Sequence, residues 1–453
     1  MLEWLREYNV VWDSPSVDQT GSMPIGNGDL GANVWVEAHT GELILLLGKT
    51  DAWDENGILL KLGRVRVRFS PSVLVNPAMF RQELNLADGT IRITAETPED
   101  RLGLTIWADA NRPVVHVEAV SRRPLEVTAS LECWRNAPRQ VRTQTSDFFK
   151  NLVGKNSDPH PTIITPDTVF AGQDGRLVWC HHNAPREPDG FEVNLRLQGL
   201  GALLGHIPHP LRGRTFGAIM TGDGFRSLDD RQIRSAAGSE CRLSIHALTL
   251  HPATTEQWLK AADELVRSVD SVKVEIARHQ HAEWWRNFWD RSHVRVTADG
   301  PREAEDAFRI TQAWLIQRFL NATAGRGRQP IKHNGSIFTV GRDGDPDARR
   351  WGPGYWFMNQ RLIYWPMLAS GDFDLMLPWL LMYRHCLDMQ RHRTRTYFGH
   401  AGAHYPETIY FWGAEVSAHY GWTPFEQRAR PEAECTYLRY YWSGGIELVV
   451  ILL

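Results

Sequence analysis

The sequence predicts an all-β sandwich followed by an all-α region, and the character of the chain changes near residue 254. Short segments that alternate hydrophobic and polar residues dominate the first part. Segments with helical periodicity dominate the rest, and Gly, Pro, Asn and Asp clusters separate the segments throughout. The predicted organisation is an antiparallel β-sandwich over residues 1–253, a helical linker over 254–280 and a helical domain over 281–453.

The first part contains many short strand-like segments and no long helical period, which is typical of an antiparallel sandwich. The period-two segments are 30–47, 62–69, 89–96, 113–120, 125–134, 191–199 and 241–250. Within the first of them, the His39–Glu42 segment predicts a hairpin turn. Residues 151–175 are polar and contain three prolines, so we expect a long loop there.

The linker begins with a capping-box pattern, in which Thr254 would cap the helix and Gln257 follows three residues later. Apolar residues then recur at helical spacing up to Val269. Strong helical stretches follow, without a return of β alternation, at 282–289, 302–322, 355–368 and 378–392. This succession of helices separated by loops suits a helical toroid.

Composition excludes several classes of protein. The net charge of −3 provides no bulk field for nucleic acid or an anionic membrane, and no apolar run approaches the roughly 18 residues of a membrane span. We therefore expect no nucleic-acid partner and no membrane partner. The five cysteines are far apart and form no metal-binding pair, so no metal and no other cofactor is expected. The N-terminal segment shows no signal peptide, and the localisation stays open.

Two motifs resemble nucleotide and calcium sites but lack the required context. Residues 26–31 satisfy GxGxxG, yet Pro24 precedes them and an alternating strand, not a helix, follows. The acidic residues of 343–347 mimic a calcium loop, but Pro346 lies inside it and the twelfth position is Gly354 rather than Glu. A turn is the better interpretation of both segments.

Polar and aromatic residues gather in three segments of the helical part, at 332–338, 351–361 and 402–408. Carbohydrate sites need flat aromatic faces for sugar C–H surfaces and polar side chains for hydroxyl groups, and these segments supply both. Aromatic residues at helical spacing are also common in cores, and buried amides are usually structural. Both interpretations therefore remain open on composition alone.

Three blocks, in order, resemble glycoside hydrolase family 95, whose characterised members are α-L-fucosidases and α-L-galactosidases. They are PIGNGDLGA at 24–32, GRQPIKHNGSIF with WGPGYWFMNQRLIYWP at 327–366, and GHAGAHYPETIYFWG at 399–413. The patterns PETxxFWG and WxxNxRLxYWPML are more similar to an uncharacterised bacterial family, domain of unknown function 5703. The resemblance covers most of the chain.

This resemblance implies a β-supersandwich, a helical linker, an (α/α)6 toroid and no cofactor. It implies inverting hydrolysis of an α-linked sugar, such as an L-fucoside or L-galactoside of a plant or host polysaccharide. In the family, a carboxylic acid protonates the leaving oxygen and two Asn residues position water; the second Asn falls on Asn359, and the first falls on Phe357. The block that contains Glu407 also departs from the family, which favours another α-linked sugar or a rebuilt catalytic set.

We therefore expect Asn359 and Glu407 to be catalytic, with an oligosaccharide or polysaccharide as substrate. The residues expected to bind this substrate are Lys332, His333, Asn334, Trp356, Arg361, His404 and Tyr405. Relatives of the resembled family are often exported to the periplasm or the extracellular space.

The length after residue 280 predicts an incomplete toroid. Six helical hairpins at about 30 residues each would need more chain than remains, and the sequence ends in the apolar stretch 445–453 without a cap. We expect the N-terminal part of a longer glycosidase, poorly soluble or inactive alone, and the resemblance to family 95 implies that its general acid lies beyond Leu453. The alternative is a non-catalytic carbohydrate-binding protein or a decayed gene fragment.

Overall fold

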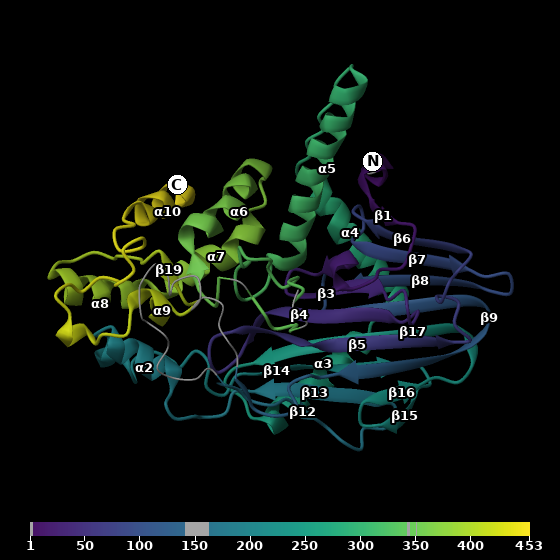
Figure 1. Cartoon of the computed structure of the whole chain (residues 1–453), viewed down its shortest axis with the longest axis horizontal. Coiled ribbons are helices and arrows are strands. Elements are labelled where there is room, and N and C mark those ends of the chain that lie inside the picture. The colour runs from purple at the N-terminus through teal and green to yellow at the C-terminus, as the bar shows by residue number, and fades with distance from the viewer. Residues whose placement is uncertain (1–2, 141–162, 342–344, 350) are drawn as a thin grey trace.

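The computed structural model describes residues 3–140, 163–341, 345–349 and 351–453 (Figure 1). A large β-sheet region occupies the N-terminal part of the chain, and most of the helices lie together beside it. The N-terminal portion of the loop predicted over 151–175 lies outside the described residues.

The described strands form one continuous sheet of fifteen strands that folds into two layers, and the long strand β9 (Val114–Glu132) belongs to both. The N-terminal half of β9 pairs with strands of the first layer and its C-terminal half pairs with strands of the second. In the first layer the order is β1 (Val10–Trp12), β6 (Met79–Asn85), β7 (Thr90–Glu96), β8 (Arg101–Ala108), β9, β17 (Gly238–Leu250), β14 (Thr215–Gly222), β13 (Arg176–His182) and β12 (Thr168–Val169).

In the second layer, β9 pairs with a strand that precedes it in the sequence, β5, and with one that follows it, β16. Its members are β2 (Met23–Gly26), β3 (Leu30–Val36), β4 (Leu43–Trp53), β5 (Leu59–Ser70), β9, β16 (Gln232–Arg234) and β15 (Arg226–Asp229). Each of the strand pairs described is antiparallel, which confirms the predicted antiparallel β architecture. Two short strands, β10 (Arg139–Gln140) and β11 (Ile163–Ile164), pair separately.

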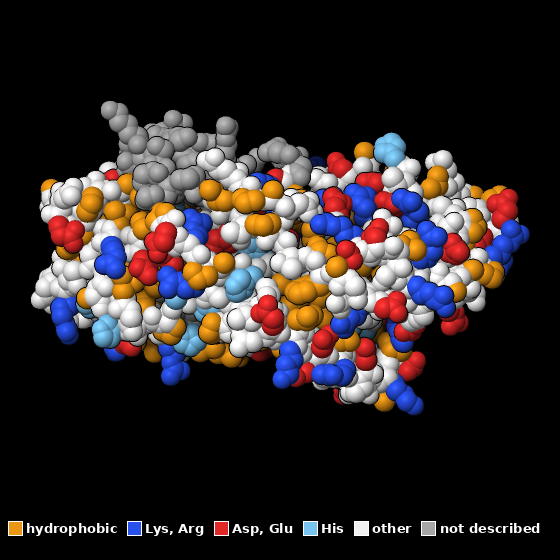
Figure 2. Space-filling model, turned by 90° about the horizontal axis from the view of Figure 1, so that it is seen from below, with side chains coloured by type: hydrophobic (Ala, Val, Ile, Leu, Met, Phe, Trp, Pro, Cys, Tyr) orange, Lys and Arg blue, Asp and Glu red, His pale blue; other side chains and the backbone are white. Residues whose placement is uncertain are grey.

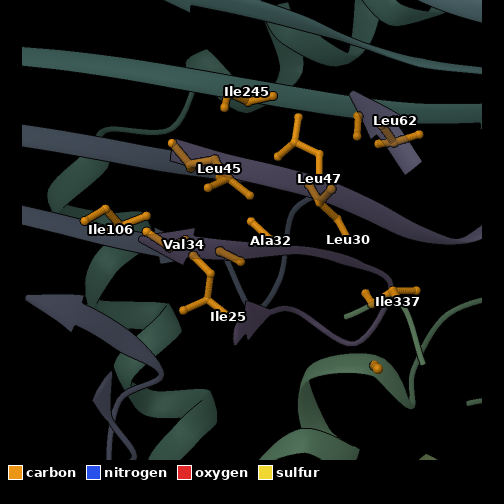
Figure 3. Close-up of a cluster of buried hydrophobic side chains, with 14 of the residues drawn as sticks. Ile25, Leu30, Ala32, Val34, Leu45, Leu47, Leu62, Ile106, Ile245 and Ile337 are labelled. Carbon is orange, nitrogen blue, oxygen red and sulfur yellow. The ribbon is translucent and has the colours of Figure 1, made fainter. Parts of the chain in front are cut away.

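The core lies between the two layers because alternate residues of each strand point inward. Figure 3 shows Val34 and Leu47 of the second layer close to Ile106 and Ile245 of the first, and all four side chains are fully buried. Burial of each such side chain contributes about 1.5–3 kcal/mol to folding.

On the surface, the face seen in Figure 2 carries acidic and basic side chains that are intermixed.

The GxGxxG segment forms the turn between β2 and β3, as predicted, and it also anchors the helical part. Gly28 has a φ of 98°, its N–H donates to the Thr323 carbonyl at 2.9 Å, and its carbonyl accepts from the N–H of Arg326 at 2.9 Å. A Cβ atom at Gly26 would overlap the Thr323 carbonyl oxygen. Glycine is therefore required here by the close approach of the two parts of the chain.

The strand predicted over 191–199 is wrong, because residues 190–197 form helix α2 (Gly190–Leu197). The side chain of Asp189 accepts from the N–H groups of Phe191 and Glu192 and so caps this helix. Phe191, Asn194 and Leu195 are buried at helical spacing, so the same apolar residues satisfy both periods. Asp189, a helix-capping residue just before the segment, is the signal that favours a helix over a strand.

The linker forms α3 (Thr255–Asp270), which packs on β14 and β17, and α4 (Val274–Asp290). Helix α5 (Pro301–Ala324) follows. Thr254 and Gln257 make the predicted capping box.

Replacement of Thr254 by Ala should lower the free energy of unfolding by about 1 kcal/mol, because the Gln257 N–H would lose its side-chain partner. Urea denaturation measures this change. Thr254→Ser keeps the hydroxyl oxygen and serves as the control; equal loss in both variants would contradict a capping role.

The later helices are α6 (Phe357–Ser370), α7 (Phe373–His385), α8 (Leu387–Phe398), α9 (Ser417–Tyr420) and α10 (Ser443–Leu452). The stretch predicted at 355–368 starts as the short strand β18 (Tyr355–Trp356), and the one at 378–392 is divided between α7 and α8 at Cys386. Short 3-10 helices lie at Glu3–Tyr8, Gln19–Gly21, Gly201–Leu203 and Phe425–Gln427. No helix among the described residues is long and apolar enough to cross a membrane.

Neighbouring helices α6, α7 and α10 expose large apolar side chains, among them Leu362, Phe373 and Ile446. We expect the chain to self-associate through these helices, because exposed apolar surface favours association. Sedimentation velocity should show oligomers, and the double variant Leu362→Glu/Phe373→Glu should reduce them. A monodisperse monomer at the highest concentration measured would contradict this expectation.

Candidate functional site

A two-residue strand pair brings two of the three candidate segments together. Strand β18 pairs with β19 (Thr408–Ile409), so the start of α6 lies beside Glu407. The Phe357 N–H donates to the Glu407 carbonyl at 2.9 Å, and the Met358 N–H donates to Glu407 Oε1 at 2.8 Å. The carboxyl group therefore sits at the N-terminal end of α6.

Glu407 is a buried carboxyl group, with 2% of the residue exposed. Its Oε2 atom has no hydrogen-bond partner among the described residues. Burial raises the pKa of Glu407 to about 8, and the nearby Glu447 adds to the rise, against the Met358 hydrogen bond and Arg361, which lower it. At neutral pH the group is mostly protonated, so Oε2 or Oε1 can carry a proton for donation.

A second carboxylate stands near Glu407, on α10. Glu447 Oε1 accepts from Arg361 Nη1 at 2.7 Å and from Trp365 Nε1 at 2.7 Å. The hydrogen bond to Glu447 raises the pKa of Arg361. Glu447 could not be identified from the sequence, because apolar residues surround it there and its long-range contact with Arg361 leaves no local pattern.

Three aromatic residues, Phe357, Tyr383 and Tyr405, pack against one another near Glu407. Burial, with a smaller contribution from Glu407, holds the pKa of Tyr383 well above its ordinary value. Tyr405 donates its hydroxyl hydrogen to the Tyr383 carbonyl at 2.8 Å, and the two rings are 5.2 Å apart. Phe357 packs edge-on to Tyr383. Tyr405 thus connects the surroundings of Glu407 with a cavity beside His404.

A cavity of about 410 Å³, here called the His404 cavity, lies between α8, α10 and the 400–405 loop. Its principal side chains are those of Phe398, His404, Tyr405, Trp442 and Ile446. The His404 ring lies 4.8 Å from the Trp442 ring and 5.7 Å from that of Phe398. Burial lowers the pKa of His404 to about 4, so its ring is neutral at pH 7, and Nδ1 has no hydrogen-bond partner among the described residues.

Asn359 lies in the first turn of α6, as predicted, one residue after Met358. Its side chain is exposed, and Asn359 is not among the residues that line the His404 cavity. Of the predicted site residues, His404 and Tyr405 line this cavity, whereas Glu407, Arg361 and Asn359 do not. Tyr405 links the cavity to Tyr383, which lies near Glu407.

The remaining candidates form a separate group around the 351–356 loop. Lys332 is buried, and its Nζ donates to the carbonyl oxygens of Pro353 and Gly354. Trp356 is also buried, and its ring lies 4.8 Å from that of His419. Burial holds the pKa of Lys332 well below its ordinary value.

His333 and Asn334 belong to the same group. The His333 N–H donates to Gln360 Oε1 at 3.2 Å, and burial lowers the pKa of the His333 ring to about 3. Asn334 Oδ1 accepts from Arg349 at 3.2 Å. The residues of this group hold a loop against α6, and none of them lines the His404 cavity.

Within the described part of the chain, no group of three or more His, Cys, Asp and Glu side chains could hold a metal ion.

Comparison with known proteins gives one family and a shared fold. The family described as Domain of unknown function (DUF5703) matches residues 11–294, which confirms that part of the predicted resemblance; the candidate site lies C-terminal to the matched residues. No curated protein sequence matches the chain.

A solved protein assigned as a kojibiose phosphorylase from the human microbiome has a TM-score of 0.54 at 11% identity, over 91% of this chain and 53% of that one. A bacterial glucoamylase in complex with acarbose has a TM-score of 0.39 at 8% identity, over 90% of this chain and 56% of that one. The chain spans about half the length of these two proteins. The first likeness shows a fold that this chain shares with a protein assigned to carbohydrate chemistry.

Proposed function

The chain belongs to the family described as Domain of unknown function (DUF5703). On the basis of this family, the fold and the geometry around Glu407, we propose that the protein is a glycoside hydrolase. The proposed reaction is inverting hydrolysis of an α-linked sugar, such as an L-fucoside or L-galactoside of a plant or host polysaccharide. The resemblance of the sequence blocks to glycoside hydrolase family 95 supports this substrate class.

The observation that carries the proposal is the buried Glu407 carboxyl group at the start of α6, whose Oε2 has no hydrogen-bond partner among the described residues. Burial raises its pKa to about 8, which favours the acid form at neutral pH. A neutral carboxylic acid can give its proton to the leaving glycosidic oxygen as the bond to the anomeric carbon breaks. We therefore propose Glu407 as the general acid, in place of the residue beyond Leu453 that the resemblance implies. A water molecule held by the Asn359 amide attacks the anomeric carbon from the opposite side. The water proton passes to a carboxylate, and we assign this role to Glu447, which the Arg361 ion pair holds in place.

The His404 cavity supports a sugar as the ligand. Its volume of about 410 Å³ lies in the range of small-molecule sites. The Trp442 and His404 rings offer flat faces for sugar C–H groups, while the unpaired His404 Nδ1 can bond a hydroxyl. In the proposal, Tyr405 and Arg361 also face the substrate, and Lys332, His333, Asn334 and Trp356 hold the loop beside it.

The pH dependence should report Glu407. Its pKa is raised to about 8 in the folded protein, so the acid form is present below that pH and is lost as pH rises through it. We expect kcat/KM to fall about tenfold for each pH unit above 8. The measurement is kcat/KM on an aryl α-glycoside between pH 5 and 10, and a profile that stays flat to pH 10 would contradict acid catalysis by Glu407.

A non-catalytic carbohydrate-binding protein is the second candidate. The burial of Glu407, of which 2% is exposed, favours it, because such a group meets substrate only after a rearrangement. A panel of aryl and natural α- and β-glycosides separates the two functions. Release of free sugar supports the hydrolase, whereas saturable binding without release from any member of the panel supports the binding protein.

A further inference from the structure

A second cavity lies beneath the turn that joins α3 to α4. Its lining residues lie between positions 109 and 277, far in the sequence from those of the candidate site. Its volume is about 250 Å³, and we call it the α3–α4 cavity. The sheet side is polar because His116, Arg242 and Ser244 point outward, while the alternate residues Leu243 and Ile245 enter the core.

The floor of this cavity presents neutral hydrogen-bonding groups. His116 is 6% exposed, and its Nδ1 lies 3.0 Å from Ser244 Oγ. Burial, with a contribution from His246, lowers the pKa of His116 to about 3, so its ring keeps one donor and one acceptor at neutral pH. Thr221 also lines the cavity, so an imidazole ring and two hydroxyl groups stand together on its sheet side.

The charged groups at the rim balance one another. Arg112 pairs with Asp109 at 3.1 Å, and Arg242 pairs with Asp223 at 2.7 Å. Lys273 and Asp270 complete a set with equal numbers of cations and anions. An ionic ligand would add uncompensated charge to this set, whereas a neutral ligand with both donors and acceptors would not.

Asp270 offers the clearest polar contact for such a ligand. Its Oδ1 lies 3.8 Å from Nε2 of the buried His246, beyond hydrogen-bond distance. Neither ring nitrogen of His246 has a hydrogen-bond partner among the described residues. Asp270 therefore retains accepting capacity at the edge of the cavity.

The helix side of the cavity is aliphatic. It consists of Val269, Val272, Val274 and Ala277. A pyranose ring has a C–H face and a rim of hydroxyl groups, so it matches one aliphatic wall opposite a wall of mixed donors and acceptors. At about 250 Å³ the cavity is smaller than most drug-sized sites, which suits one sugar ring rather than an oligosaccharide.

We infer that the α3–α4 cavity binds a single neutral pyranose, either as a free monosaccharide or as the terminal residue of a glycan. This site is separate from the His404 cavity, and binding to it does not depend on hydrolysis at that cavity. It would give the sandwich a sugar-binding role of its own.

Saturation-transfer NMR and calorimetric titration test the inference, with D-glucose, D-galactose, D-mannose, L-fucose and their methyl glycosides as probes. Inorganic phosphate is the charged comparison. The test variants are Thr221→Val, which keeps the shape of the side chain, and Thr221→Val/Asp270→Ala. Glu264→Ala, at an exposed position on α3, is the matched control, and His404→Ala disables the other cavity.

At least one pyranose should bind with a Kd in the millimolar range, and the double variant should weaken it at least about tenfold. Thr221→Val alone should weaken it less, while Glu264→Ala should leave it unchanged. In His404→Ala, which disables the other cavity, binding at the α3–α4 cavity should remain with the same Kd. Equal affinity for the monosaccharide and its methyl glycoside supports entry of a terminal residue, and preference for the free sugar supports a monosaccharide site.

Three results would overturn the inference. These are the absence of saturable binding by any probe up to about 50 mM, binding that His404→Ala abolishes while the double variant keeps it, and tighter binding of phosphate than of any sugar. Failure of this test leaves the proposed hydrolysis intact, because hydrolysis is measured at the other cavity.

Discussion

Replacement of Glu407 by Gln, or of Asn359 by Ala, is expected to lower kcat by about 100-fold or more. Gln keeps the shape of the side chain, and its carbonyl oxygen can still accept from the Met358 N–H that now binds Oε1 at 2.8 Å. It has no carboxyl proton to give to a leaving oxygen. Ala at Asn359 removes the amide that would hold the attacking water.

Steady-state kinetics on the best glycoside of the panel measures both effects, and Glu426→Gln is the control because Glu426 is exposed on a short 3-10 helix. A normal kcat with a raised KM in Glu407→Gln would make Glu407 a binding residue only. An aryl glycoside with a good leaving group should lose less activity in Glu407→Gln than one with a poor leaving group, since it needs less protonation. Equal losses would count against an acid role.

Replacement of Arg135 by Met is expected to destabilise the protein by about 3–5 kcal/mol. Arg135 is 1% exposed and joins two buried carboxylates: Nη1 lies 2.9 Å from Asp347 Oδ2, and Nε lies 2.9 Å from Asp167 Oδ1. Its Nη2 also donates to the Lys61 carbonyl at 2.9 Å. Removal of the guanidinium leaves both carboxylates buried with reduced compensation, although Arg139 still reaches Asp347 and His181 still reaches Asp167.

The shift of the urea midpoint and of Tm measures this loss. Arg81→Met is the matched control, because Arg81 pairs with Glu83 at the surface and such pairs contribute about 0–1 kcal/mol. A loss below about 1 kcal/mol in Arg135→Met would contradict the account of a buried ionic network.

Local patterns predicted the elements whose residues interact with near neighbours in the sequence. The capping box at Thr254, the hairpin at 39–42 and the strands of the sandwich depend on spacing that the sequence displays directly. Residues 191–199 show the limit of such patterns, because their apolar residues fit a strand and a helix equally well. The Asp189 cap decides between the two.

The candidate site depends on contacts that leave little local signal. The pair of two-residue strands β18 and β19 places Glu407 at the start of α6, and two residues are too few to show a period. Glu447 contacts Arg361, which lies 86 positions away in the sequence. Glu447 belongs to the apolar stretch 445–453, which was interpreted only as an uncapped chain end. The resemblance of the sequence blocks, rather than periodicity, singled out Glu407 and Asn359.

Lys332 illustrates a different difficulty. A polar residue in a loop-like segment is normally expected at the surface, yet Lys332 is buried and donates to two backbone carbonyl groups. Its Nζ atom also lies 4.5 Å from the centre of the Tyr355 ring. Such a position follows from the tertiary fold, since the carbonyl groups that receive its hydrogen bonds lie more than twenty residues away in the sequence.

The most direct test of the account is proton NMR of the first turnover products when the protein acts on α-linked aryl and natural glycosides. We expect free sugar to appear and the β anomer to form first, before mutarotation, and on glycosides with poor leaving groups Glu407→Gln should release this sugar at least about 100-fold more slowly. Absence of free sugar from every α-glycoside that binds, or initial release of the α anomer, would contradict it.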